Sequence, residues 1–357
     1  MDLRQFLRSD LLDLKPYHVN QPPHQIKLDA NESPFDLPVE IQEEIVAEIK
    51  HLQFQRYPDA SSDLLRTELS EHLGVDKEQI VVGNGSDELI GYFILAFGRA
   101  EACASFPTPT FSMYHILAQI ARLKAVRLPL DERFDLNVEA WHSHLDANRL
   151  NLVFISYPNN PTGNAFSAKA IHQMFSRSDT LAIIDEAYYE FSGKTFISEL
   201  GQHPNLIITR TFSKAYGLAG LRIGYLIAHP EIVYEINKVR LPYNLNRFSQ
   251  IAAVLLLKHY AQRKCTPRLS PQIQLILSER ERVFNTLKAA EGICPFPTDA
   301  NFILFRTDQS ADEVFQRLLD RGILVRNLNH PGPLHNCLRV TIGAPGENDM
   351  FLEALGV

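Results

Sequence analysis

A lysine among hydroxyl groups, glycines and an arginine is the most informative feature of the sequence. Lys214 lies in Thr211-Phe-Ser-Lys214-Ala-Tyr-Gly-Leu-Ala-Gly-Leu-Arg222-Ile-Gly, directly after an apolar run. A lysine amine forms an imine with an aldehyde, while Ser213 and Arg222 are residue types that bind a phosphate. The segment therefore indicates a site for a phosphorylated aldehyde. On its own, an exposed lysine in a glycine-rich loop explains the segment about as well.

An acidic residue follows another apolar run, in Leu181-Ala-Ile-Ile-Asp185-Glu-Ala-Tyr188-Tyr. Active-site groups of parallel sheets gather at the carboxyl ends of the strands, so an acid just past a buried strand is well placed to face a cofactor. An aspartate in this position is also a common helix N-cap. Taken alone, the segment favours the N-cap over the cofactor contact.

Two more segments place polar residues at strand ends. Asn160 lies in Ser156-Tyr-Pro-Asn-Asn160-Pro161-Thr-Gly163, although Asn-Pro and Thr-Gly also simply mark turns. Ser86 and Asp87 lie in Val82-Gly83-Asn-Gly85-Ser86-Asp87-Glu88, between a strand and a helix. Free N–H groups at a helix start attract phosphate. The segment is neither GxGxxG nor a P-loop with its lysine, so it does not specify a nucleotide.

These segments lie where short apolar runs alternate with helical patterns. Amphipathic sequence, such as residues 87–97 and 168–175, separates most of the runs. This alternation predicts a mostly parallel sheet that helices cover on both faces. The predicted strands are Ile80–Val82, Ala102–Phe106, Ala125–Leu128, Leu152–Ser156, Leu181–Ile184, Leu206–Thr209 and Ile223–Ala228.

The two ends of the chain follow other patterns. Pro16, Pro22 and Pro23 interrupt any helix near the N-terminus, which indicates an arm. Beyond about residue 245, long helical sequence precedes short strands near residues 302–305, 323–326 and 338–342, which indicates a smaller α+β domain. The predicted organisation is an N-terminal arm over residues 1–30, a large α/β domain over 31–245 and a small C-terminal domain over 246–357.

Composition limits the class of protein. The chain has 357 residues, of which 45% are hydrophobic and 22% charged, as in globular proteins. A net charge of −7 argues against a nucleic-acid partner, and the longest apolar run, Ile251–Leu257, is too short for a membrane span. Four scattered cysteines and thirteen histidines without metal spacing predict no disulfide framework and no metal site. We expect a soluble, cytoplasmic protein.

Together and in this order, the four segments resemble the fold-type I pyridoxal 5′-phosphate (PLP) aminotransferases of the aspartate aminotransferase superfamily. The resemblance covers nearly the whole chain. It implies an α/β fold in which a large PLP-binding domain has a mostly parallel sheet between helices. Lys214 would be the Schiff-base lysine, Asp185 would pair with the pyridine nitrogen, and Tyr188 and Asn160 would bond the phenolic oxygen.

The same resemblance implies further contacts with the cofactor. Phe111, in Pro109-Thr-Phe111-Ser-Met-Tyr114, would stack on the ring where the family more often has tyrosine, so a hydroxyl is missing there. The residues implied to hold the phosphate end are Ser86, Asp87, Thr211, Ser213 and Arg222.

A narrower resemblance, to the histidinol-phosphate aminotransferase branch, rests on four other segments. They are Lys15-Pro-Tyr17, Leu28-Asp-Ala-Asn31-Glu32-Ser-Pro34, Arg56-Tyr57-Pro58 and Leu338-Arg339-Val-Thr-Ile-Gly343. The resemblance implies a homodimer in which Tyr57 reaches the PLP phosphate of the neighbouring subunit. The residues implied to bind substrate are Tyr17, Asn31, Arg326 and Arg339.

The activity implied by this branch transfers the amino group of histidinol phosphate to 2-oxoglutarate in histidine biosynthesis. Its products are imidazole-acetol phosphate and glutamate. Two alternatives stay open because spacing alone does not identify a substrate: an aromatic amino-acid aminotransferase and an enzyme like threonine-phosphate decarboxylase. A non-enzymatic PLP-binding regulator is a third alternative, which no added DNA-binding segment supports.

Overall fold

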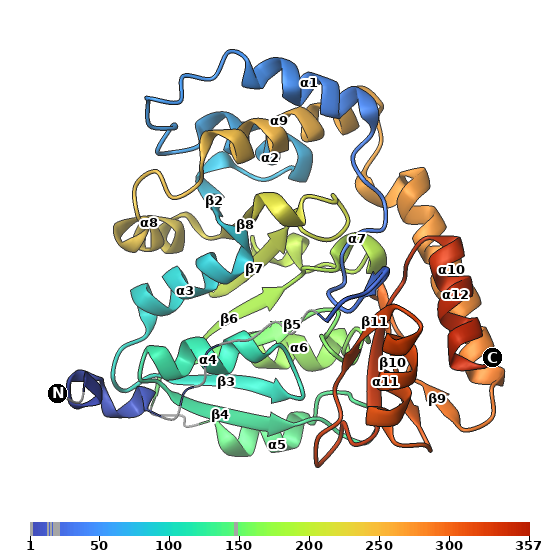
Figure 1. Cartoon of the computed structure of the whole chain (residues 1–357). Coiled ribbons are helices and arrows are strands. Elements are labelled where there is room, and N and C mark those ends of the chain that lie inside the picture. Colours follow the sequence, from blue (N-terminus) through green and yellow to red (C-terminus); the bar gives the residue numbers. More distant parts are fainter. Residues whose placement is uncertain (1–2, 13, 15, 17–21, 146–148) are drawn as a thin grey trace.

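The computed structural model describes residues 3–12, 14, 16, 22–145 and 149–357, and these contain two separate sheets (Figure 1). The larger sheet has seven strands in the order β2-β8-β7-β6-β5-β3-β4. Strands β3 to β7 are parallel, whereas β8 runs antiparallel to both β7 and β2. The strands are β2 (Ile80–Gly83), β3 (Cys103–Thr108), β4 (Lys124–Pro129), β5 (Asn151–Ser156), β6 (Thr180–Asp185), β7 (Leu206–Thr211) and β8 (Gly224–Ala228).

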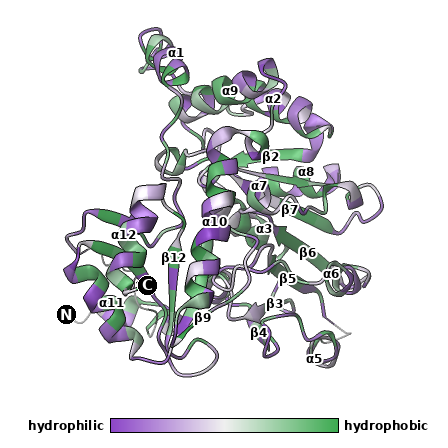
Figure 2. Ribbon diagram, turned by 90° about the vertical axis from the view of Figure 1, so that its right-hand side faces the viewer, coloured by the Kyte–Doolittle hydropathy of each residue, from purple (hydrophilic) through white to green (hydrophobic). Residues whose placement is uncertain are grey.

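Helices cover the larger sheet on both faces, as the continuous apolar runs predict. On one face α1, α2, α5, α6 and α9 share a core with the sheet, and on the other face α3, α4 and α8 do. The strands are mostly green in Figure 2, whereas the helices mix purple and green. These helices are α1 (Val39–Ile49), α2 (Asp63–Leu73), α3 (Gly85–Phe97), α4 (Ser112–Ile120), α5 (Val138–His144), α6 (Ala168–Phe175), α8 (Pro230–Val239) and α9 (Arg247–Gln262); the short α7 (Tyr189–Ser192) follows β6.

The smaller sheet has five strands in the order β1-β11-β12-β10-β9. Its first strand, β1, comes from the predicted arm and pairs in parallel with β11, with Ile26 opposite Ile323. Helices α10, α11 and α12 share a core with this sheet. The elements are β1 (Ile26–Leu28), α10 (Pro271–Ala289), β9 (Ile293–Pro295), β10 (Phe302–Thr307), α11 (Ala311–Asp320), β11 (Ile323–Asn327), β12 (Cys337–Thr341) and α12 (Pro345–Leu355).

The predicted domain boundaries stay a prediction, and two elements bear on them. The strand β1 lies within the predicted arm but belongs to the smaller sheet. Helix α9 follows the predicted boundary at residue 245, yet it packs on α1 and α2 in the core of the larger sheet. The arm therefore contributes a strand to the smaller sheet, and the core of the larger sheet extends beyond residue 245.

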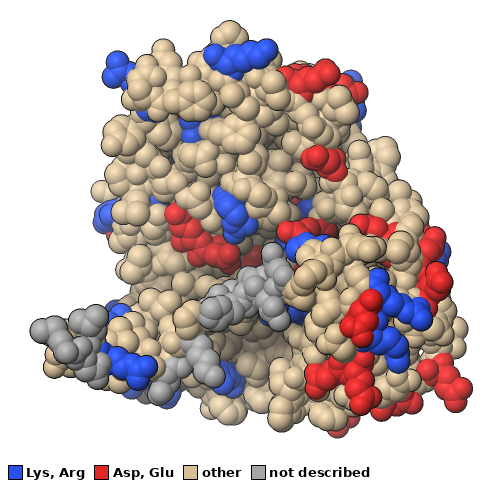
Figure 3. Space-filling view, viewed as in Figure 1, with Lys and Arg blue, Asp and Glu red and all other residues tan. Residues whose placement is uncertain are grey.

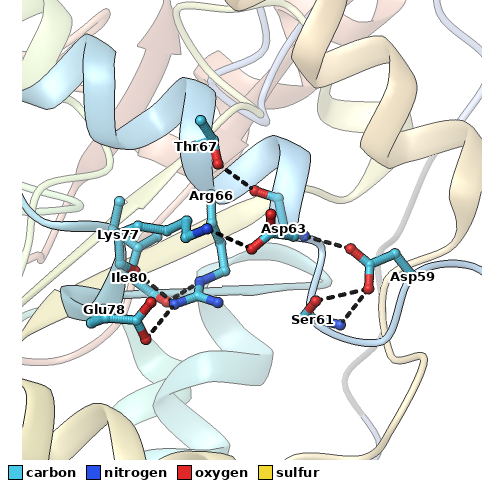
Figure 4. Close-up of polar contacts among 8 residues, drawn as sticks. All are labelled: Asp59, Ser61, Asp63, Arg66, Thr67, Lys77, Glu78 and Ile80. Atoms are coloured by element: carbon cyan, nitrogen blue, oxygen red, sulfur yellow. Dashed lines mark hydrogen bonds and ion pairs between the residues drawn. The ribbon is translucent and has the colours of Figure 1, made fainter.

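The start of α2 is held by a residue that the sequence did not single out. Ser62, which directly precedes the helix, makes no side-chain cap bond. Instead, Asp59 accepts hydrogen bonds from the amides of Ser61 at 3.0 Å and Asp63 at 2.6 Å (Figure 4). The carboxylate of Asp59 thus takes the capping role.

Two side-chain contacts then tie α2 to the chain entering β2 (Figure 4). Arg66 donates to the carbonyl of Ile80 at 3.0 Å, and Lys77 pairs with Asp63 at 2.7 Å. Helix α2 ends at Gly74, whose left-handed φ of +68° suits a glycine. These contacts fix the start of β2, the strand that leads to Ser86 and Asp87.

The surface agrees with the modest negative charge of the chain. On the face in Figure 3, basic and acidic side chains are interspersed, and both signs gather over α11. Within the described residues, every helix is too short or too polar to cross a bilayer.

Candidate active site

A cavity of about 820 Å³ lies between the two sheets, where the carboxyl ends of β5, β6 and β7 face β11 and β12. It is lined by the start of α3, the loop before α4 and residues 29–31 as well. The predicted site residues that line it are Asn31, Ser86, Asp87, Phe111, Asn160, Asp185, Tyr188, Thr211, Ser213, Lys214, Arg222, Arg326 and Arg339.

Two predicted site residues remain to be placed. Tyr17 lies outside the described residues. Tyr57 is 76% exposed, and its ring stacks on that of Tyr243 with 4.5 Å between centroids. Among the described residues that line the cavity Tyr57 does not appear, so within one chain it has no contact with this site.

Asp185 is the last residue of β6, and one oxygen of its buried carboxylate is available to accept a hydrogen bond. The side chain is 3% exposed, and Tyr114 donates its hydroxyl to Oδ2 at 2.9 Å. Oδ1 has no hydrogen-bond partner among the described residues. Burial raises the pKa of Asp185 to about 6, although the bond from Tyr114 opposes the shift. A buried carboxylate oxygen without a partner fits a cationic N–H at this end of the cavity.

Lys214 follows β7 and enters the cavity from the same edge of the sheet. Its Nζ donates to the carbonyl of Ala30 at 2.9 Å and lies 6.0 Å from the centre of the Tyr188 ring. Burial, and next the positive charge of Arg339, lower the pKa of Lys214 to about 8. The amine is therefore closer to its neutral, nucleophilic form than an exposed lysine is.

A cluster of donors surrounds the start of α3. Arg222 Nη1 donates to Ser213 Oγ at 3.2 Å, and the Ser213 and Thr211 hydroxyl oxygens are 2.9 Å apart. Arg222 Nη2 lies 3.5 Å from Asp87 in the first turn of α3. Gly85 has a φ of +79°, and a Cβ there would lie 2.7 Å from Arg222 Nη2. A larger residue at position 85 would therefore displace the guanidinium.

Tyr188 and Asn31 form a buried pair on the opposite side of the lysine. Asn31 Nδ2 donates to the Tyr188 hydroxyl at 2.9 Å. Asn31 also bonds Thr341 at the end of β12 through its backbone amide, at 2.9 Å. The pair thus connects the larger sheet, the N-terminal segment and the smaller sheet at one point.

Phe111 lies directly before α4 and lines the cavity, with its ring perpendicular to that of Tyr114 and 5.6 Å away. Sequence reasoning assigned no role to Tyr114, which holds Asp185. The available signal was its position three residues after Phe111, in the first turn of α4.

Two arginines on neighbouring strands of the smaller sheet lie side by side in the cavity wall. Arg326 in β11 is directly opposite Arg339 in β12, and both line the cavity. Arg339 is 8% exposed and donates to Asn160 Oδ1 and, at 2.6 Å, to the carbonyl of Asp29. Opposed like charges destabilise a strand pair, so this pair is suited to an anion between the two guanidinium groups.

Sequence reasoning also missed His115 and Arg127, which line the cavity beside Phe111. Arg127 Nη2 lies 2.7 Å from His115 Nε2. One residue is on α4 and the other on β4, and no local motif connects them. Their proximity follows from the fold alone.

The chain belongs to the aminotransferase class I and II family, whose model matches residues 23–355. Within that class, it is 42% identical to the histidinol-phosphate aminotransferase of Aquifex aeolicus (strain VF5), over 96% of this chain and 95% of the relative. It is 41% identical to histidinol-phosphate aminotransferase 1 of Carboxydothermus hydrogenoformans (strain ATCC BAA-161 / DSM 6008 / Z-2901), over 100% and 99% of the two chains.

A solved structure shares the fold. The histidinol-phosphate aminotransferase from Sinorhizobium meliloti, in complex with pyridoxal-5′-phosphate, superposes with a TM-score of 0.82 at 27% identity, over 93% of this chain and 90% of that one. These findings confirm the predicted family, fold class and PLP dependence. The chain is a PLP-dependent aminotransferase.

Proposed function

We propose that the chain transfers the amino group of histidinol phosphate to 2-oxoglutarate, giving imidazole-acetol phosphate and glutamate. The observation that carries the proposal is the cross-strand pair of Arg326 and Arg339 on the cavity wall. Histidinol phosphate has no carboxylate, so its anionic end is a phosphate. A dianion removed from water needs more than one positive partner, and the two arginines provide that. The relatives named above support the same substrate.

PLP supplies an electron sink for the amino group transfer. We assign the pyridine nitrogen to Asp185, whose buried Oδ1 can accept from a cationic N–H. Tyr114 holds the other oxygen and so orients the carboxylate. Phe111, Asn160 and Tyr188 also line the cavity; Phe111 would offer a ring face to the cofactor, and Asn160 and Tyr188 would bind its phenolic oxygen. In this arrangement the chain keeps the ring nitrogen positive, which is the state that favours loss of a substrate proton.

We assign proton transfer to Lys214, which is also the residue that binds the cofactor covalently at rest. Its Nζ would take the proton from the substrate carbon that bears the amino group. A pKa of about 8 leaves a useful neutral fraction near neutral pH, and the carbonyl of Ala30 positions the amine. These are the properties that a general base requires.

The phosphate end of the cofactor is assigned to the cluster at the start of α3. Ser86 and Asp87 occupy the first turn of α3, where backbone amides have no acceptor within the helix and can bind an anion. Thr211, Ser213 and Arg222 add two hydroxyl groups and a guanidinium. The negative Asp87 next to this cluster is offset by Arg222 and Lys214.

For the substrate we assign the phosphate to Arg326 and Arg339, together with Asn31 and, from the N-terminal arm, Tyr17. Arg339 is already fixed by Asn160 and Asp29, so it can bind an anion with little reordering. A carboxylate of 2-oxoglutarate can use the same guanidinium groups in the second half of the cycle, because an arginine binds either anion bidentately.

We further propose a homodimer in the cytoplasm, with Tyr57 contacting the cofactor phosphate of the neighbouring subunit. The support is a group of exposed large apolar side chains close in sequence to Tyr57 or to Tyr243, on which Tyr57 stacks; they include Phe54 and Leu241. Phe54 is 81% exposed, which is unusual for a large aromatic side chain unless a partner covers it.

Hybrids test the shared site. Mixing Lys214→Ala chains with Tyr57→Ala chains should restore activity, because one composite site of each hybrid contains neither change. Sedimentation of an active monomer at assay concentration would contradict the dimer. Failure to regain activity in verified hybrids would place Tyr57 outside the catalytic unit.

The substrate is tested by spectral half-reactions of the purified holoenzyme. Histidinol phosphate, phenylalanine, tyrosine and threonine phosphate are compared by kcat/KM, each followed by 2-oxoglutarate. The proposal expects histidinol phosphate to react fastest. A preference for phenylalanine or tyrosine would replace it with an aromatic aminotransferase, and release of CO₂ from threonine phosphate would replace it with a decarboxylase.

A further inference from the structure

A group of two histidines and a glutamate lies away from the cavity, on the helical layer of the larger sheet. The residues are His172 on α6, Glu199 in the single turn Ile197–Glu199, and His203 just before β7. Helix α6 lies at the outside of the molecule in Figure 2. None of the three residues lines the active-site cavity.

The three side chains converge on one point. The His172 Nε2 and the His203 Nε2 each lie 3.9 Å from a different oxygen of Glu199. One ligand atom from each residue lies within 4.8 Å of the other two. The side chains are only partly exposed, so they are accessible to an ion without being freely mobile.

Local structure explains why the group is held together. The amide of His203 donates to the carbonyl of Glu199 at 3.0 Å, which closes a helical turn and puts the two side chains on the same side. The imidazoles pack on buried aromatic rings: His203 lies 4.7 Å from Phe175, and His172 lies 5.5 Å from Phe196. The ligand groups are therefore partly oriented before any ion binds.

We propose that His172, Glu199 and His203 form a binding site for Zn²⁺ or a similar divalent transition ion, with water in the remaining position. Two imidazoles and a carboxylate are a known zinc ligand set. In a tetrahedral site with bonds of about 2.0–2.1 Å, ligand atoms are about 3.3 Å apart. An ion would have to draw the ligand atoms together by side-chain rotation, because the two His–Glu gaps are 3.9 Å and the three ligand atoms lie within 4.8 Å of one another.

The site would cross-link two connections that lead into the active site. Helix α6 precedes β6, which ends at Asp185, and His203 precedes β7, which leads to Lys214. An ion bound here would stabilise the folded chain by mass action without touching the reacting groups. No local motif indicates the site, because His172 and His203 are thirty-one positions apart and only Glu199 and His203 have helical spacing.

The test uses the PLP-loaded enzyme after treatment with a chelator. Zn²⁺ alone is titrated in by calorimetry, and the melting temperature is measured with and without Zn²⁺. We expect one Zn²⁺ per chain at this site and a rise in melting temperature. His203→Ala and Glu199→Gln should each weaken binding by more than about a hundredfold, the upper range for a merely supporting residue. His51→Ala, on an exposed histidine elsewhere, is the matched control.

Three results would overturn the proposal. One is the absence of saturable Zn²⁺ uptake by the wild-type enzyme. Another is uptake that His203→Ala and Glu199→Gln leave unchanged, which would place the ion elsewhere. The third is an equal loss in His51→Ala. Unchanged kcat in His203→Ala, measured without Zn²⁺, shows that the variant is folded and that a loss of binding comes from the missing ligand.

Discussion

The two sheets contribute to the cavity in different ways. The larger sheet supplies residues at or just beyond strand ends: Asp185 after β6, Lys214 after β7, and Ser86 after β2. The smaller sheet supplies Arg326 and Arg339 from within strands that pair side by side. Groups at strand ends belong to short local segments, whereas the arginine pair depends on the register of two strands. The position of the strand-end groups is thus set by local sequence motifs, whereas the position of the two arginines is set by how the strands pair.

This difference suggests that the two sheets have separate roles, which experiments can test. The larger sheet holds every residue that we assign to the ring and phosphate of PLP within one chain, and the smaller sheet holds the two cations that we assign to the substrate. Changes in the first group should affect all substrates equally. Changes in the second should distinguish between substrates.

The largest effect is expected from Lys214→Ala. Loss of the amine removes both the covalent link and the proposed base, so turnover should be abolished while PLP still binds non-covalently. Borohydride reduction and peptide mapping of the wild type should label Lys214. Lys238→Ala, at an exposed lysine paired with Glu235, is the control and should retain activity. A label on another lysine would remove Lys214 from the centre of the site.

Asp185→Asn should come next, with losses of about a hundredfold or more in kcat and kcat/KM together. An amide cannot hold a positive ring nitrogen as the carboxylate does. PLP should still bind, and all substrates should slow by similar factors. Tyr114→Phe should have a smaller effect of the same kind, because it removes only the bond to Oδ2. Single-turnover rates near wild type in Asp185→Asn would rule out the role.

Changes in the arginine pair should distinguish between the two substrates. Arg326→Ala should weaken the binding of histidinol phosphate by about 2–5 kcal/mol, as the loss of one partner of a buried ion pair does. It should weaken the binding of 2-oxoglutarate less. Arg339→Ala should harm both half-reactions, since Arg339 can bind either anion. Measuring kcat/KM for each half-reaction tests this, with Arg317→Ala on the outside of α11 as control. Equal losses on both substrates in Arg326→Ala would show that Arg326 does not select the phosphate.

The smallest effect is a pH dependence of PLP capture by the apoenzyme. With a pKa of about 6, Asp185 loses its charge as the pH falls below that value, so binding should weaken there. With a pKa of about 8, Lys214 becomes neutral as the pH rises, so covalent capture should speed up and then level off above pH 8. Stopped-flow absorbance measures both. Asp185→Asn should remove the change near pH 6 and keep the one near pH 8.

The sequence predicted the larger sheet well because six of its seven strands are continuous, almost fully buried runs, and only the edge strand β4 is mostly exposed. All seven predicted strands match β2 to β8 within about two residues. It did not predict β1, a three-residue strand after a proline-rich stretch, whose partner β11 is distant in the chain. Nor did it indicate the cap of α2, because Asp59 accepts from the amide of Asp63 across four positions of a loop.

The site residues also divide into those that local sequence indicates and those that depend on contacts between distant segments. Asn160, Asp185 and Lys214 lie in short segments whose composition alone indicates a site. The fold brings these segments to one cavity. Tyr114 escaped notice because its partner Asp185 is seventy-one positions away. The pairing of Arg326 with Arg339 could not be read from the sequence either, since a shift of one residue in register would point one of them away.

The pairing of β1 with β11 also dictates an order of events during synthesis. Residues 26–28 leave the ribosome 297 positions ahead of their partners at 323–325. The strand β1 therefore stays unpaired until β11 has been made, and Ala30, which positions Lys214, lies just beyond it. A ribosome-bound chain that ends before β11 contains every strand of the larger sheet, yet its lysine is still without this support.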